Sequence, residues 1–332
     1  MKEDILKRKR IVPSFLTSRY TRVILLIRRQ PNFYGCRLKQ ILLCEEVKDR
    51  MKKLYVTDLD GTLLNSQIKL SSYTIDTLNR LIQSNLMITY STARSFYTTS
   101  KLLNQVNFQL PCITYNGVYV IDAKIGEVLR KNLLEHSIFN EVMDIAKKLK
   151  LKPFVFGKTA LGEEKLLYEN EENIAHVRFI EERRNRNDKR LNKIISNEYQ
   201  LDEFITISFL YPLEEIRSLE QILKKKYQDE ISIKIIKDIY NEGYYTLEVS
   251  NKDANKGKML EYVSEYLGVD LDNITVFGDQ ANDKEMFEKA GIKVAVNNAN
   301  RELKSLADII IESNDNDGVA KYLEREYLSP EV

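Results

Sequence analysis

The feature that most constrains the fold is a series of short apolar runs that end at polar clusters and alternate with amphipathic stretches. The apolar runs, each of strand length, are residues 54–56, 86–90, 112–114, 274–277, 294–296 and 309–311. The stretches with helical spacing of apolar residues are 72–85, 95–106, 256–267 and 283–290. Strands that alternate with helices favour parallel pairing, so the sequence predicts an α/β fold with a layered, Rossmann-like parallel sheet.

The middle of the chain, residues 132–248, has a different pattern. Its predicted strands are 153–156, 205–210, 231–236 and 245–249, and its predicted helices are 137–150 and 213–227. We therefore expect a core domain of residues 51–131 and 249–332 that is interrupted by an inserted α/β cap domain of residues 132–248. A charge-dense part of the insertion, residues 181–193, is interpreted as a solvated helix end or loop.

Residues 1–50 form a basic leader without clear periodicity. They contain 13 Lys and Arg against 5 Asp and Glu, leaving 38 against 44 in the rest of the chain. Met51 then opens the string MKKLYVTDLDGTLL, which is typical of a fresh amino terminus. We expect the leader to be disordered or a mis-annotated start. A targeting or membrane-surface segment and an ordinary flexible tail are the alternatives.

Composition excludes several classes of protein. A net charge of +2 gives no overall field for nucleic acid, and no apolar run approaches the roughly 20 residues that span a bilayer. Three cysteines without CxxC spacing favour reduced thiols, and therefore a cytoplasmic location, over disulfides. Two histidines make a His-rich zinc site improbable. The expected partner is a small molecule, with neither nucleic acid nor membrane involved.

Two carboxylates stand two positions apart directly after the first apolar run, in the string Asp58-Leu59-Asp60-Gly61-Thr62. Such a pair can divide the work of group transfer, with one carboxylate as nucleophile and the other as proton donor and acceptor. Gly61 permits the tight turn that leaves the strand. A lone Asp-Gly pair is often only a turn, but the whole string after an apolar strand is far more specific.

The other polar clusters each have a structural and a functional interpretation. Ser91-Thr92-Ala93-Arg94 can cap a helix, or can hold a phosphate through a hydroxyl and a guanidinium. Lys256 on its own would be a solvated lysine. Asp279 is placed like a ligand of Mg²⁺, which prefers carboxylate oxygens, although a capped strand-end turn is the alternative. In open α/β sheets the ligand crevice lies outside the carboxyl ends of the strands, so together the clusters favour an active site there.

The order and spacing of these clusters resemble the haloacid dehalogenase superfamily, specifically its Cof-type, sugar-phosphatase-like branch with a C2-type α/β cap. The matching strings are DLDGTLL (58–64), STARS (91–95), ITYNG (113–117), NKGKML (255–260), FGDQANDKEMF (277–287) and NDNDGVAKYLE (314–324). The resemblance covers about residues 51–326, which is nearly everything beyond the leader.

The resemblance implies a role for each matching residue. Asp58 is implied as the nucleophile and Asp60 as the general acid and base, with Thr92 and Lys256 completing the catalytic set. The implied Mg²⁺ site consists of Asp58, Asp60, Asp279 and, in support, Asp283. The implied phosphate-binding residues are Leu59, Gly61, Thr92, Ala93, Arg94, Asn116, Gly117, Lys256 and Asn282. Ala93 stands where the family often has glycine, and the phosphate-binding hydroxyl stays ambiguous between Ser91 and Thr92.

The predicted function is Mg²⁺-dependent hydrolysis of a small phosphorylated metabolite, a sugar phosphate or a phosphorylated cofactor, through an aspartyl phosphate. Mg²⁺ and Lys256 would offset the repulsion between a phosphate dianion and a carboxylate nucleophile. A phosphotransferase such as a phosphomutase is the alternative, because the inserted cap would choose the acceptor. A catalytically silent metabolite-binding protein is a third. The sequence indicates neither the metabolite nor the oligomeric state.

Overall fold

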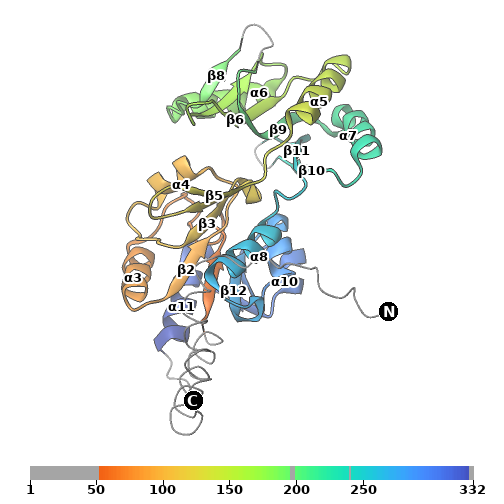
Figure 1. Cartoon of the computed structure of the whole chain (residues 1–332). Helices are drawn as coiled ribbons and strands as arrows, with labels where there is room; N and C mark the ends of the chain where they lie inside the picture. Colours follow the sequence, from red (N-terminus) through yellow and green to blue (C-terminus); the bar gives the residue numbers. More distant parts are fainter. Residues whose placement is uncertain (1–51, 195–198, 239–240, 329–332) are drawn as a thin grey trace, which may run out of the picture. The chain divides into compact units, whose positions relative to one another are not determined.

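The computed structural model of the protein describes residues 52–194, 199–238 and 241–328 (Figure 1). The basic leader lies outside the described residues, so the expectations about its role stay predictions. The strands of the described residues belong to a five-stranded, a six-stranded and a three-stranded sheet.

The five-stranded sheet is parallel throughout, in the order β14-β13-β12-β1-β2. Its strands are β1 (Leu54–Thr57), β2 (Met87–Tyr90), β12 (Ile274–Gly278), β13 (Ile292–Val296) and β14 (Ile309–Ile311). Every residue of β1 and β12 is buried, which is typical of strands that helices cover on both faces. The predicted α/β fold with a parallel sheet is confirmed.

Helices connect and cover these strands. They are α3 (Ser72–Gln83), α4 (Phe96–Leu102), α8 (Lys256–Leu267), α9 (Lys284–Phe287), α10 (Arg301–Leu306) and α11 (Gly318–Leu328). Helix α3 begins after Ser71, whose hydroxyl accepts a hydrogen bond from the Thr74 amide, and it buries Leu78 and Leu81 on one face. Helix α8 coincides with the helix predicted for residues 256–267.

The expected third strand of the parallel sheet is wrong in its pairing. Residues 112–114 do form a strand, β3 (Pro111–Thr114), but it pairs antiparallel with β4 (Tyr119–Asp122), which in turn pairs with β5 (Val128–Lys131). A single parallel bridge from Ser91 to Ile113 links β3 to the end of β2. The chain reverses at Asn116 and Gly117, whose φ values are +52° and +101°, so β3 continues into a hairpin rather than into a crossover helix.

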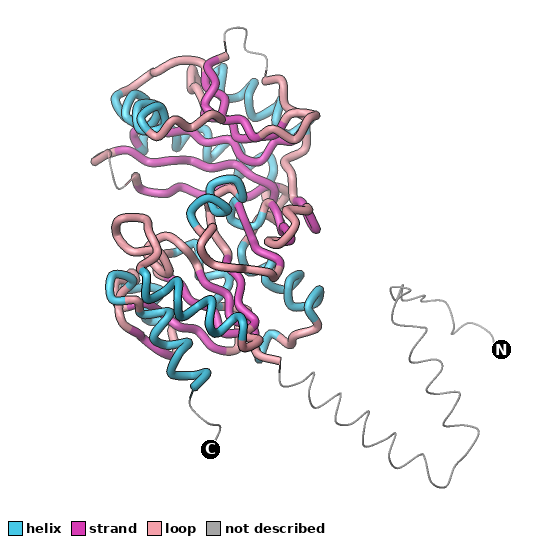
Figure 2. The backbone as a smooth tube through the Cα atoms, turned by 90° about the vertical axis from the view of Figure 1, so that its left-hand side faces the viewer, coloured by secondary structure: helices cyan, strands magenta, loops and turns pink. Residues whose placement is uncertain are grey.

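The six-stranded sheet is built from the middle of the chain, in the order β10-β11-β9-β6-β7-β8, and all its pairs are antiparallel except β7 with β8. Figure 2 draws the strands of the protein in magenta and its helices in cyan. Its strands are β6 (Phe154–Lys158), β7 (Glu164–Tyr168), β8 (Leu191–Lys193), β9 (Glu203–Pro212), β10 (Ile231–Lys237) and β11 (Tyr244–Asn251). Its helices are α5 (His136–Lys148), α6 (Ile174–Asn185) and α7 (Leu213–Tyr227).

Sequence reasoning found α5, α7 and four of these strands, but it missed β7, β8 and α6. The charge-dense segment 181–193 comprises the end of α6, a turn and β8. Apolar side chains between Leu134 and Val249 form a buried cluster of their own under this sheet. The division of the chain at residues 132 and 248 stays a prediction, although β11 runs past the second boundary to Asn251.

Two chain segments lead into and out of this sheet, and amide side chains cross-link them. Asn132 Nδ2 donates to the Gly117 carbonyl at 2.9 Å and approaches the Asp253 carbonyl at 3.2 Å. Asn251 Nδ2 donates to the Leu133 carbonyl at 2.8 Å. The entry and exit of the inserted segment, residues 132–248, therefore lie side by side.

Candidate active site

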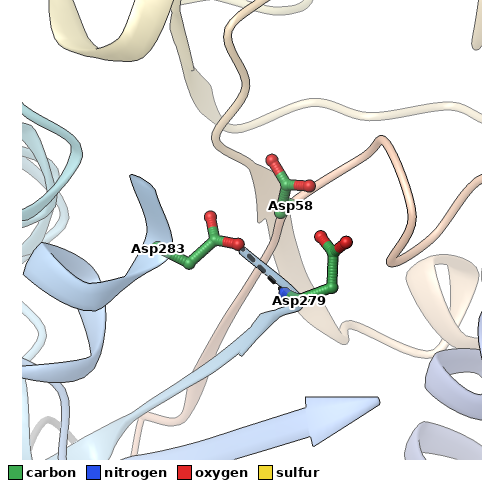
Figure 3. Close-up of side chains that lie close together, drawn as sticks. All are labelled: Asp58, Asp279 and Asp283. Carbon is green, nitrogen blue, oxygen red and sulfur yellow. Dashed lines mark hydrogen bonds between the residues drawn. The ribbon is translucent and has the colours of Figure 1, made fainter. Parts of the chain in front are cut away.

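The carboxylates of the site meet because two central strands end together. β1 and β12 are neighbours in register, and the Asp58 amide donates to the Phe277 carbonyl at 2.9 Å. Asp58 follows β1, Asp279 follows β12, and Asp283 ends the short 3-10 helix Ala281–Asp283. One oxygen from each of these buried carboxylates lies within 4.8 Å of the others (Figure 3).

Asp279 is held by the turn that follows Asp58. The Thr62 hydroxyl donates to Asp279 Oδ1 at 3.0 Å, and Gln280 Nε2 donates to Oδ2 at 3.2 Å. Gly61 has φ +75°, and a Cβ atom there would lie 2.3 Å from Asp279 Oδ2. Glycine is therefore required at position 61 both by the backbone conformation and by the close approach of Asp279.

Lys256 joins two of the carboxylates. It is the first residue of α8, after Asn255, whose side chain caps the helix by accepting from the Lys258 amide. The buried Nζ donates to Asp58 Oδ1 at 2.6 Å and to Asp283 Oδ1 at 2.7 Å. Asp283 uses its other oxygen to accept from the backbone amide of Asp279 at 3.0 Å (Figure 3) and from that of Gln280 at 3.1 Å. Both oxygens of Asp283 thus accept hydrogen bonds, and Asp283 holds Lys256 and the turn after β12 in place.

One ammonium among three carboxylates leaves the site with excess negative charge. Burial raises the pKa of Asp58 well above its usual value, and the charges of Asp283 and Asp279 raise it further, against the opposing effect of Lys256. Burial, with the Asp283 charge, raises the pKa of Asp279 to about 6. Burial lowers the pKa of Lys256, but Asp283 and Asp58 more than offset this, so it lies above the usual value. Such a site favours a bound cation.

Arg94 contacts Asp60. Its Nε donates to Asp60 Oδ2 at 2.6 Å, and one terminal nitrogen donates to Oδ1 at 2.5 Å. The Asp60 carboxylate is outside the group formed by Asp58, Asp279 and Asp283. The structure therefore pairs Arg94 with the second motif carboxylate, and the implied roles of Asp60 as a metal ligand and of Arg94 as a phosphate ligand stay predictions.

Both candidate hydroxyls at the end of β2 are buried. Thr92 Oγ1 accepts from the Arg94 amide at 3.1 Å, whereas Ser91 Oγ has no hydrogen-bond partner within the described residues. The side chain of Leu59 lies in the apolar core, so only its backbone could contact a phosphate, and Ala93 is exposed. The ambiguity between Ser91 and Thr92 remains.

A loop of three residues with positive φ borders the same site. Tyr115, Asn116 and Gly117 have φ values of +49°, +52° and +101°. Asn282 Nδ2 lies 3.4 Å from Asn116 Oδ1, and a Cβ atom at Gly117 would lie 2.5 Å from the Asn255 amide nitrogen. The loop therefore packs against both the segment that carries Asn282 and the start of α8.

Sequence reasoning missed three residues that position Asp279 and Lys256. Thr62 and Gln280 bind Asp279, and Asn255 caps the helix that carries Lys256. All three lie inside strings that had been singled out. The signal that could have found them is their side-chain type, because hydroxyl and amide groups beside buried carboxylates are expected to satisfy them.

The comparisons with known proteins agree with this geometry. Residues 55–323 match the model of the haloacid dehalogenase-like hydrolase family. The chain belongs to this family. The predicted membership of the haloacid dehalogenase superfamily is thereby confirmed, and the protein is a hydrolase by family.

Relatives of this family member match over nearly their whole length. A putative phosphatase of Haemophilus influenzae is 28% identical over 83% of this chain and 99% of its own length. An HMP-PP phosphatase of Serratia proteamaculans is 28% identical over 84% of this chain and 97% of its own. A 5-amino-6-(5-phospho-D-ribitylamino)uracil phosphatase of Bacillus subtilis is 26% identical over 83% and 97%.

Solved structures share the fold of this hydrolase. A protein from Thermotoga maritima is 25% identical, has a TM-score of 0.67 and covers 85% of this chain and 99% of its own. A haloacid dehalogenase-like hydrolase from Bacteroides thetaiotaomicron is 25% identical, with a TM-score of 0.68 and coverage of 82% and 99%. Among the described residues, none of the helices combines the length and the apolar character that a membrane span requires.

Proposed function

We propose that this hydrolase is a Mg²⁺-dependent phosphatase of small phosphorylated metabolites. The observation that carries the proposal is the buried Asp58 carboxylate at the end of β1, bonded to Lys256 and adjacent to Asp279 and Asp283. Relatives matched over nearly their full length carry phosphatase names, which supports the same reaction class.

The donor set fits a hard divalent cation. All three side chains offer carboxylate oxygens and are buried, and burial together with their mutual repulsion raises the pKa values of Asp58 and Asp279. Within the described residues, one oxygen of Asp58 accepts a hydrogen bond, and each oxygen of Asp279 accepts one from a neutral side chain. Asp283 is more fully used, because the Lys256 ammonium and two backbone amides all donate to it. Asp58 and Asp279 would therefore hold Mg²⁺, with Asp283 in support. When bound, Mg²⁺ would neutralise charge on the site and on the phosphoryl group.

The reaction divides between Asp58 and Asp60. An oxygen of Asp58 attacks phosphorus, the bond from phosphorus to the leaving oxygen breaks, and Asp60 gives its proton to that oxygen. Asp60 then takes a proton from water, whose oxygen attacks the aspartyl phosphate and releases Asp58 and inorganic phosphate. Lys256 keeps one Asp58 oxygen fixed, and its positive charge balances the charge that develops on the phosphoryl group.

We expect phosphate binding to draw on residues that follow β2, β3 and β12. Thr92 and Arg94 supply a hydroxyl and a guanidinium, and Asn116 and Asn282 supply amides. In the structure Arg94 is committed to Asp60, so Asp60 can act as an acid only when this contact is released. An arriving phosphate offers Arg94 an alternative anion, and its binding would free Asp60.

We further propose that the inserted segment acts as a cap that selects the substrate. Its separate buried cluster and its paired entry and exit segments support a module of this kind. Two relatives carry names of phosphatases that act on HMP-PP and on a phosphoribitylamino-uracil, so a phosphorylated heterocycle joins sugar phosphates among the candidate substrates. The cytoplasmic location stays a prediction.

The test is a screen of phosphorylated metabolites with Mg²⁺ in which released phosphate is measured. Phosphate release from at least one sugar phosphate or phosphorylated heterocycle is expected. The same reactions with an added sugar phosphate as acceptor separate hydrolysis from transfer, because a phosphotransferase would form a new ester in place of free phosphate. Absence of both products for every ester would contradict the proposal and favour the silent metabolite-binding alternative.

A further inference from the structure

Arg190 differs in burial from Arg184 and Arg186, two other arginines of the charge-dense segment 181–193. The side chains of Arg184 and Arg186 are 54% and 60% exposed, whereas that of Arg190 is 17% exposed. A guanidinium that is removed from water in this way needs partners for its donors.

The backbone of Arg190 is fixed at the edge of the six-stranded sheet. Its carbonyl accepts from the Leu166 amide at 2.7 Å and from Asn192 Nδ2 at 2.6 Å. Its Nε and one terminal nitrogen donate to the two carboxylate oxygens of Asp188, at 2.9 and 2.7 Å. This paired contact sets the plane of the guanidinium, which leaves one terminal nitrogen to point elsewhere.

That remaining nitrogen, Nη1, reaches the segments that border the active site. It donates to Ser95 Oγ at 2.9 Å and lies 3.4 Å from the Tyr115 hydroxyl. The Tyr115 hydroxyl in turn donates to Glu164 Oε2 at 3.2 Å, and Glu164 lies 3.5 Å from Arg190. Arg190 and Glu164, both from the inserted segment, therefore bind two side chains outside it.

Ser95 and Tyr115 bracket Arg94. Ser95 follows it directly and caps α4 by accepting from the Thr98 amide at 3.1 Å, while the Tyr115 amide donates to the Arg94 carbonyl at 3.0 Å. Tyr115 also opens the run of positive φ that continues through Asn116. Such a conformation is strained for residues other than glycine, and it persists only where surrounding contacts hold it. The hydroxyl contacts and the Phe156 ring, 6.5 Å away, are contacts of this kind.

We infer that Arg190 is a positioning residue of the active site, which acts through Ser95 and Tyr115 to hold Arg94 and the Asn116 loop in place. Each of its three guanidinium nitrogens already donates to a protein group, which favours a positioning role over a contact with the substrate. The inserted segment therefore contributes to the geometry of the phosphate site itself as well as to the choice of substrate. The activity arm of the test rests on the proposed phosphatase function, whereas the exchange arm does not.

The exchange arm compares Arg190→Ala with Arg186→Ala, which removes the same charge from an exposed position where the guanidinium pairs with Glu182 of the same helix. Amide hydrogen exchange is measured for peptides that cover residues 90–97 and 113–118. Arg190→Ala should accelerate exchange in both peptides, and Arg186→Ala should leave both unchanged. Equal exchange in the two variants would overturn the inference, whether or not the protein proves to be a phosphatase.

The activity arm measures kcat and KM on p-nitrophenyl phosphate and on the best metabolite found by screening. A misplaced Arg94 affects every phosphate ester, so Arg190→Ala should lower kcat roughly 10- to 100-fold on both substrates. A loss confined to KM for the metabolite would mean that Arg190 contacts the leaving group, and would overturn the positioning role. Wild-type inactivity on all esters would count against the proposed function alone.

Two milder variants keep the test decisive in case Arg190→Ala fails to fold. Tyr115→Phe removes one hydroxyl and keeps every charge, and Arg190→Lys keeps the charge without the paired contact to Asp188. Both should have a Tm close to that of the wild type, with Tyr115→Phe accelerating exchange in the 113–118 peptide and Arg190→Lys restoring part of the lost kcat. If Arg190→Ala does not fold, these two variants decide by the same readouts.

Discussion

The guanidinium of Arg94 holds both carboxylate oxygens of Asp60, through contacts of 2.6 and 2.5 Å. This pairing gives the two motif carboxylates different surroundings, because Asp58 is held instead by the buried ammonium of Lys256. Asp58, proposed as the nucleophile, is thus fixed next to Asp279 and Asp283. Asp60, proposed as the acid, is held by a guanidinium that a phosphate could attract away.

Substitution of the two carboxylates should separate their roles. Asp58→Asn should abolish turnover of every ester, because an amide cannot form an aspartyl phosphate. Asp60→Asn keeps the nucleophile and removes the proton donor, which is worth about 10²–10⁴-fold. It should therefore retain more activity on p-nitrophenyl phosphate, whose leaving group needs little protonation, than on an alkyl phosphate. Equal losses on both esters would contradict the role of Asp60.

The metal requirement should appear both in turnover and in stability. Activity should be lost after exhaustive EDTA treatment and restored by Mg²⁺, with Mn²⁺ or Co²⁺ as substitutes. Full turnover in EDTA would rule out the metal-dependent mechanism.

Asp279→Asn tests the proposed metal site in the absence of substrate. Burial raises the pKa of Asp279 to about 6 in the folded protein, so the free energy of unfolding decreases as pH rises from about 4 through 6. At pH 7.5 in EDTA the variant should therefore be more stable than the wild type, by at most about 3 kcal/mol, and Mg²⁺ should no longer raise its Tm. The exposed Asp229→Asn is the control, and a variant that still gains Tm from Mg²⁺ would exclude Asp279 as a ligand.

Gly61→Ala tests the close approach of the Asp58 turn to Asp279. The new methyl group would lie 2.3 Å from Asp279 Oδ2, so the carboxylate must move and the concentration of Mg²⁺ for half-maximal activity should rise by about 10-fold or more. Gly162→Ala is the matched control, because Gly162 has φ +77° and nothing within 4 Å of its Cβ position. Both variants should lose about 1–2 kcal/mol of stability from the backbone. Equal metal affinity in the two would show that the clash is harmless.

His176 should make the six-stranded sheet sensitive to acid. Burial lowers its pKa to about 4, the rings of Phe154 and Tyr211 lie 4.9 and 5.0 Å away, and Nδ1 accepts from the Glu172 amide at 3.3 Å. The unfolded chain binds a proton near pH 6.5 and the folded chain does not, so stability falls as pH drops from about 6.5 to 4.

This acid sensitivity amounts to about 3 kcal/mol at most, and His176→Gln should remove most of it in urea titrations at pH 7 and pH 5. His136→Gln, at an exposed position, is the matched control. An unchanged slope in His176→Gln would assign the acid sensitivity to another group.

Much of this architecture could be predicted because local pattern and tertiary role coincide. The apolar strands β1 and β12 are buried on both faces, so they read as continuous apolar runs, and the residues after them necessarily share one edge of the sheet. Helices α7 and α8 each carry an apolar face and coincide with their predicted bounds.

The rest depended on contacts between residues far apart in sequence. Strand β5, with the sequence VLRK, is largely exposed, and β8 is three residues long, so neither has a periodic signal. Arg190 looked like one more solvated charge, because its burial depends on Ser95 and Tyr115, which are 95 and 75 positions away. Sequence spacing likewise gave no indication that Arg94 would hold Asp60.

The cross-links made by Asn132 and Asn251 have a consequence for engineering. When an inserted segment leaves and re-enters a domain at one place, the two ends of the host chain lie close together. The entropic cost of closing that gap is then small for any inserted segment. A graft that exchanges residues 132–251 for the corresponding segment of a relative should therefore preserve the parallel sheet, while Arg190 identifies a contact that the donor segment must also supply. Under the proposed role of the inserted segment, such chimaeras would give one hydrolase scaffold a series of different substrates.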